Sequence, residues 1–136
     1  MNAIISDIGA LRPEFRLIVC KWLHIVVADL DIDARIRETM RSPERQRMLE
    51  ALGKTDVKMG WHNVGLAFDF AVFKDGIYVT DGSDPLYLKC GLIAQAFDCR
   101  WPIRLASGAI DAGHIEYHPG FTLQQFLDGK KGGIVA

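Results

Sequence analysis

Three stretches of the chain combine the hydrophobic spacing of a helix with recognisable helix ends. Residues 15–23 carry apolar side chains at helical spacing, and Pro13 stands where a first helical residue would stand. In the second stretch, Ser42 precedes Pro43, so that a capping hydroxyl is followed by a residue that favours the first turn. An aspartate–proline pair opens the third stretch. The predicted helices span about residues 13–29, 43–52 and 85–98.

Extended segments are predicted where apolar and polar side chains alternate. Along residues 32–38, this alternation places Ile36 and Glu38 on one face and Arg37 on the other. In the longest strand, large apolar side chains alternate with a second face on which Asp69 lies between two alanines. The predicted strands span about residues 32–38, 66–73, 77–79, 103–105 and 114–118.

The order of these elements defines the fold class. Helices and antiparallel strands are mixed without regular β-α-β alternation, which predicts an α+β fold with a small antiparallel sheet packed with about three main helices. A length of 136 residues suits one domain over residues 1–136. A capping box at Thr122 predicts a short last helix, and the tail at residues 129–136 is expected to be mobile.

Composition and charge exclude several classes of function. The 16 basic and 17 acidic residues give a net charge of −1, and no basic stripe interleaved with aromatic residues is present, so a nucleic-acid partner is not expected. The apolar runs are too short to span a bilayer, and the first residues lack the pattern of a secretory signal. We therefore expect no membrane partner and synthesis in the cytosol.

The cysteines indicate what a metal site can be made of. Cys20, Cys90 and Cys99 form no C-x-x-C pair, and their odd number favours reduced, mostly buried thiols. A metal site in this chain would therefore be built from histidines and carboxylates.

Two stretches carry such residues. His62 precedes the longest strand, separated from it by a glycine that lets the chain bend back over the face bearing Asp69. Burying this carboxylate without a partner would be costly, and a metal or a cationic side chain would remove that cost. In the second stretch, His114 and Glu116 share one face of a strand by the i, i+2 rule, and Asp111 stands three positions before the histidine.

These residues fit a catalytic zinc site, although simpler explanations apply to each of them alone. Two histidines and one aspartate leave one position of a tetrahedral zinc for water, which is typical of catalytic sites. Taken alone, His62 is equally explained as a surface or turn histidine, and Asp69 as a strand residue paired with an arginine. His114, Glu116 and His118 are equally explained as a solvated strand face. From the residues alone these alternatives stay open.

The order and spacing of the motifs resemble those of a known family. H-x-x-G-x-A-x-D runs from His62 to Asp69, D-x-x-H-x-E runs from Asp111 to Glu116, and an R-S-x-x-x-Q segment begins at Arg41. Together they resemble the zinc-dependent D-alanyl-D-alanine carboxypeptidases of the VanY-like family, which include phage endolysins with L-alanyl-D-glutamate peptidase activity and share the Hedgehog/DD-peptidase fold. The resemblance covers about residues 10–127.

The resemblance implies a role for each matching residue. It implies one zinc ion held by His62, Asp69 and His114, a general base at Asp111, and a cation at Arg41 near the scissile carbonyl. Glu116 is a candidate to orient a ligand histidine, with a surface glutamate as the alternative. The sequence departs from the family at Gly60, where the family usually has a serine, so a hydrogen bond of that hydroxyl is absent.

The implied function is hydrolysis of an amide bond in the peptidoglycan stem peptide. We expect a monomeric L-alanyl-D-glutamate endopeptidase, a phage endolysin made in the host bacterial cytoplasm that acts on the cell wall after its release. The alternatives are a D-alanyl-D-alanine carboxypeptidase and a non-catalytic zinc-binding module. Trp61, Trp101, Tyr117 and His118 are candidates to line the substrate groove, with core packing as the alternative for the aromatic residues.

Overall fold

The computed structural model describes residues 4–53, 60–105, 107–118 and 120. The first predicted helix is present, and it changes its hydrogen-bonding pattern part-way. Helix α1 spans Pro13–Leu23 and continues as a π-helical segment, His24–Asp29. At its end the Leu30 N–H donates to the carbonyl of Ile25, five residues back, at 2.9 Å.

The other two predicted helices begin at the expected residues. Helix α2 spans Pro43–Ala51, and the Ser42 hydroxyl accepts from the Arg45 N–H at 3.2 Å. Helix α3 spans Pro85–Ala96, and the Asp84 carboxylate caps it in the same way. Helix α3 ends two residues earlier than predicted.

A four-stranded antiparallel sheet carries the site. Strand β2, Ala67–Lys74, pairs with β1, Asp33–Glu38, and also with β3, Ile77–Tyr78, and β6, His114–Glu116. The hairpin predicted between β2 and β3 is therefore confirmed. The last strand is shorter than predicted, since it ends at residue 116.

A second pairing was not predicted. Strand β4, Ile103–Arg104, pairs with β5, Ile110–Asp111, and these residues form a separate two-stranded sheet. Residues 110–111 lie between the strands predicted at 103–105 and 114–118. A strand of two residues has no alternation to detect, and its pairing depends on a partner elsewhere in the chain.

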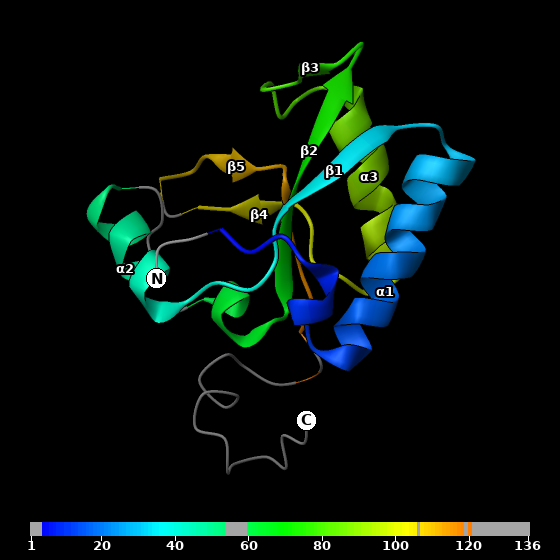
Figure 1. Cartoon of the computed structure of the whole chain (residues 1–136). Helices are drawn as coiled ribbons and strands as arrows, with labels where there is room; N and C mark the ends of the chain where they lie inside the picture. Colours follow the sequence, from blue (N-terminus) through cyan, green and yellow to red (C-terminus); the bar gives the residue numbers. More distant parts are fainter. Residues whose placement is uncertain (1–3, 54–59, 106, 119, 121–136) are drawn as a thin grey trace.

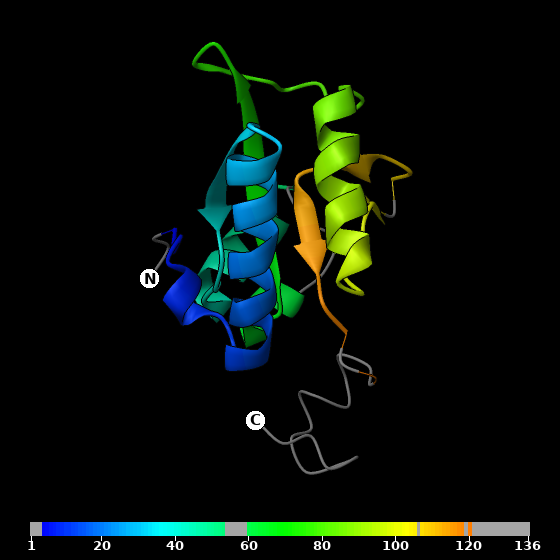
Figure 2. The ribbon, with the colours of Figure 1, turned by 90° about the vertical axis from the view of Figure 1, so that its right-hand side faces the viewer.

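The core lies between the sheet and two helices. Figures 1 and 2 show α1 and α3 side by side on one face of the sheet, whereas α2 and the β4–β5 pair lie on the other side. The Trp22 ring on α1 packs against Phe68 and Phe70 of β2, with ring centroids 5.0 Å apart in each case. Its indole N–H donates to the Cys90 carbonyl on α3 at 2.9 Å. The large apolar face of β2 is therefore covered, and the Asp69 face is directed toward the other side.

Two further expectations concern parts of the chain that are not described. The short helix predicted from Thr122 and the tail at residues 129–136 lie outside the described residues. Within the described part, no helix is both long enough and apolar enough to cross a membrane.

Candidate metal centre

The sheet and one short helical turn bring His62, Asp69 and His114 together. Asp69 on β2 lies directly opposite His114 on β6 in the strand register. His62 lies in a 3-10 turn, Trp61–Val64, which ends at Gly65 with a left-handed backbone (φ 74°). This conformation favours glycine, and it turns the chain into β2 so that His62 faces the same carboxylate.

The distances fit a site for a single ion. The Asp69 Oδ1 atom lies 3.0 Å from His62 Nε2 and 3.0 Å from His114 Nδ1. One donor atom from each of the three residues lies within 4.8 Å of the others. Each of these two ring nitrogens can contact Asp69 only by donating a hydrogen bond. A divalent cation at this point would replace the two shared protons. Two imidazoles and one carboxylate suit zinc, and the donor set is therefore chemically consistent with this metal.

The neighbours of the two histidines direct the correct nitrogen toward the site. His62 Nδ1 lies 2.7 Å from the Thr39 carbonyl oxygen, which can only accept, so Nδ1 carries the proton and Nε2 faces Asp69. His114 Nε2 lies 2.7 Å from Glu116 Oε1, which leaves Nδ1 facing Asp69. Glu116 therefore occupies the position of an orienting acceptor, as in the carboxylate–histidine pairs of many metal sites.

The electrostatics of the site follow from these contacts. Burial opposes ionisation of Asp69, but the charges and hydrogen bonds of His62 and His114 outweigh this cost and hold the pKa of the carboxyl far below its usual range. Burial alone would lower the pKa of His114, whereas hydrogen bonds to Asp69 and Glu116 raise it to about 10. The site thus strongly favours positive charge next to Asp69.

A buried ion-pair network supports the far side of Asp69. Arg41 Nη2 lies 3.5 Å from Asp69 Oδ2 and 2.8 Å from Glu38 Oε1. Glu38, only 4% exposed, also pairs with Arg45. Burial raises the pKa of Glu38, but the hydrogen bonds from the two arginines outweigh burial and lower it overall. The structure thus places Arg41 at the candidate metal centre, in contact with the carboxylate of Asp69.

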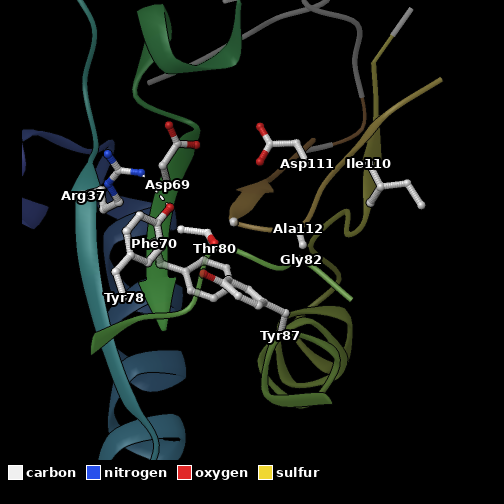
Figure 3. Close-up of a pocket in the computed structure, with 11 residues that line it drawn as sticks. Arg37, Asp69, Phe70, Tyr78, Thr80, Gly82, Tyr87, Ile110, Asp111 and Ala112 are labelled. Carbon is white, nitrogen blue, oxygen red and sulfur yellow. Dashed lines mark hydrogen bonds between the residues drawn. The ribbon is translucent and has the colours of Figure 1, made fainter. Parts of the chain in front are cut away.

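Asp111 lies on a cleft next to the three donors. The cleft has a volume of about 290 Å³, and both Asp69 and Asp111 line it. Figure 3 shows their side chains at the same end of the cleft, Asp69 from β2 and Asp111 from the β4–β5 pair. Burial, and then the negative charge of Asp69, raises the pKa of the Asp111 carboxyl. A carboxylate with a raised pKa beside a metal site is suited to proton transfer.

Three further candidates for the substrate groove contact other side chains of the protein. Trp61 stacks on His118 with ring centroids 4.1 Å apart, and His118 contacts Glu116. Tyr117 stacks on Phe15 with centroids 5.8 Å apart, which identifies it as a core residue.

The second tryptophan candidate and two of the cysteines are packed in the interior. Trp101 packs over Gly91 and donates to the Ala112 carbonyl at 2.8 Å. Cys90 and Cys99 are buried, and burial raises the pKa of each thiol to about 12, whereas Cys20 is exposed. All three are free, as expected.

Two supporting residues, Glu38 and Thr39, were given no role at the site from the sequence. Thr39 contributes only its backbone carbonyl, which no residue pattern reveals. Glu38 was assigned to the same strand face as Ile36. In the structure it lies opposite Asp69, because the register of β1 shifts between Ile36 and Glu38.

Comparison with known proteins adds one finding. The chain matches no protein-family model and no curated protein sequence. Among solved structures it is similar to the L-Ala D-Glu endopeptidase ChiX of Serratia marcescens, with a TM-score of 0.65 and 14% sequence identity over 86% of this chain and 91% of that chain. This chain therefore has the fold of that peptidase, and the predicted α+β class is confirmed.

Proposed function

We propose that this protein is a zinc-dependent metallopeptidase that hydrolyses an amide bond in the peptide stems of peptidoglycan. The observation that carries the proposal is the meeting of His62, Asp69 and His114 at one point, beside a cleft that also exposes Asp111. The fold it shares with ChiX supports a cell-wall peptide as the substrate.

The side chains divide the chemistry between them. Zinc held by His62, Asp69 and His114 would polarise the scissile carbonyl and lower the pKa of an attacking water to about 7. Asp111 accepts a proton from that water and delivers it to the leaving amine. Arg41 contributes positive charge beside Asp69, and we propose that it also favours the negative charge that develops on the carbonyl oxygen.

The specific bond we propose is the one between L-alanine and D-glutamate. The name of ChiX, an L-Ala D-Glu endopeptidase, supports this choice. In this proposal the protein is a monomeric phage endolysin, made in the host bacterial cytoplasm and active on the wall after release. Cleavage between two terminal D-alanines uses the same groups and is the alternative.

Digestion of purified peptidoglycan tests the proposal. The zinc-loaded protein is expected to release fragments whose masses locate the cut before D-glutamate, and a chelator is expected to stop the reaction. Loss of one terminal D-alanine would instead identify a carboxypeptidase. The same preparations should lyse Gram-negative cells stripped of their outer membrane.

A variant separates catalysis from metal binding. Asp111→Asn is expected to retain zinc and to lose turnover, whereas Asp75→Asn, in the exposed β2–β3 turn, should leave both unchanged. Full activity of Asp111→Asn would remove this residue from the mechanism. A wild-type protein that binds zinc and cleaves nothing would be a non-catalytic zinc module.

A further inference from the structure

The pairing of β1 with β2 is irregular at Arg37. Ile36 pairs with Phe70 and Glu38 pairs with Asp69, so β1 advances two residues while β2 advances one. Arg37 is the additional residue of this β-bulge. Bulges bend a strand and re-aim side chains, often next to active sites.

Arg37 lines the cleft that contains Asp69 and Asp111. It is the one basic side chain among the cleft-lining residues of the described chain. Figure 3 shows it on the β1 side of the cleft, together with Tyr78. A positive charge therefore lines the same cleft as Asp69 and Asp111, on the surface a substrate would contact.

Arg37 is held in place, but no carboxylate of the described residues pairs with its charge. It donates to the Tyr78 hydroxyl at 3.0 Å, and its guanidinium carbon lies 5.3 Å from the centre of that ring. Among the described residues it has no carboxylate partner. Arg35, two positions earlier, does have a carboxylate partner, because it donates two hydrogen bonds of 2.9 Å to Asp33. A guanidinium has several donors in a planar fork, which matches a carboxylate.

We propose that Arg37, oriented by Tyr78, binds the α-carboxylate of the substrate residue whose amine is released. This inference rests on the proposed function and holds for either bond. In a stem peptide, D-glutamate is joined onward through its γ-carboxyl and keeps its α-carboxylate free, and a terminal D-alanine also carries one. The carboxylate is thus attached to the carbon next to the scissile amide nitrogen. Arg37 therefore makes the protein prefer substrates that carry this α-carboxylate.

Two matched peptides test the proposal, L-Ala-γ-D-Glu-L-Lys and its D-isoglutamine counterpart, in which a carboxamide replaces the α-carboxylate. For the zinc-loaded wild type, kcat/KM for the carboxylate peptide should exceed that for the carboxamide by about 10- to 100-fold, as expected for a hydrogen bond between charged groups. Arg37→Ala should reduce this preference to within about twofold. Tyr78→Phe should lower it in part, and Arg35→Ala should retain it.

A binding measurement separates this proposal from the proposed function. Affinities of both peptides for zinc-loaded Asp111→Asn, with and without Arg37→Ala, are measured by NMR titration. The proposal is supported if Asp111→Asn binds the carboxylate peptide more tightly and Arg37→Ala abolishes this preference. This result would support it even if the wild type cleaves neither peptide and the hydrolytic function is wrong. Equal binding of both peptides, binding of neither, or a preference that survives Arg37→Ala would overturn it.

Discussion

Removal of the Glu116 carboxylate should weaken metal binding, although Glu116 is not one of the three candidate ligands. Glu116 Oε1 lies 2.7 Å from His114 Nε2, and both side chains are largely shielded from water, at 12% and 14% exposure. Loss of this contact frees the imidazole to rotate and makes its other nitrogen less basic. Orienting partners of this kind typically contribute 10- to 100-fold in metal affinity, or about 1.4 to 2.7 kcal/mol.

The size of the effect should depend on the replacement. Glu116→Ala removes both the acceptor and the charge and should reach the upper part of this range. Glu116→Gln keeps an acceptor for the imidazole N–H and should lie near the lower end. Glu14→Ala removes an exposed glutamate paired with Arg12 and should leave the affinity unchanged.

Competition with a zinc chelator of known affinity gives the dissociation constant of each variant. Thermal unfolding of the metal-free proteins provides the control for folding, because a variant that unfolds would also lose zinc. If Glu116→Ala binds zinc within about twofold of the wild type, the assignment of Glu116 as the orienting partner of His114 is wrong.

Three further predictions follow from the structure. Glu38→Gln should cost about 3 kcal/mol at pH 7, because two partly buried arginines lose the charge of their shared carboxylate. The pKa of Glu38 is lowered, so this stability is present above the ordinary value of 4.5 and is lost as the pH falls below it. Wild type and variant should therefore converge in urea unfolding at acidic pH. Gly91→Ala should cost about 1 to 3 kcal/mol in the same assay, because the new methyl group would lie 2.0 Å from the Trp101 ring, and a smaller loss is expected when Trp101→Leu is already present. Burial and the negative charge of Asp69 raise the pKa of Asp111, so in the metal-free protein its carboxyl should titrate above the ordinary value of 3.8; an NMR titration of the metal-free protein that gives 3.8 or less would contradict this environment.

Local signals were enough to predict most of the fold. Helix starts at Pro13, Ser42 and Asp84 depend on caps and prolines within a few residues, and the structure has all three. The alternation along β2 is a property of one strand, so the face that carries Asp69 was also predictable.

The features that were missed depend on pairing between distant segments. The bulge that places Glu38 opposite Asp69 exists only in the register between β1 and β2. Simple alternation along residues 32–38 therefore assigned Glu38 to the wrong face. Strand β5, which places Asp111 beside the cleft, depends in the same way on its pairing with β4.

Zinc K-edge X-ray absorption of the purified, zinc-loaded protein would identify the side chains that hold the metal. One zinc per chain is expected, with nitrogen and oxygen ligands at about 2.0–2.2 Å, the scattering signature of two imidazoles, and no sulfur shell. This signal should be lost in His62→Ala and in His114→Ala. It should be retained in His24→Ala, which replaces an exposed histidine that is not part of the candidate metal centre. A sulfur ligand near 2.3 Å, or an unchanged spectrum in His62→Ala, would contradict the assignment of His62, Asp69 and His114 as the metal centre.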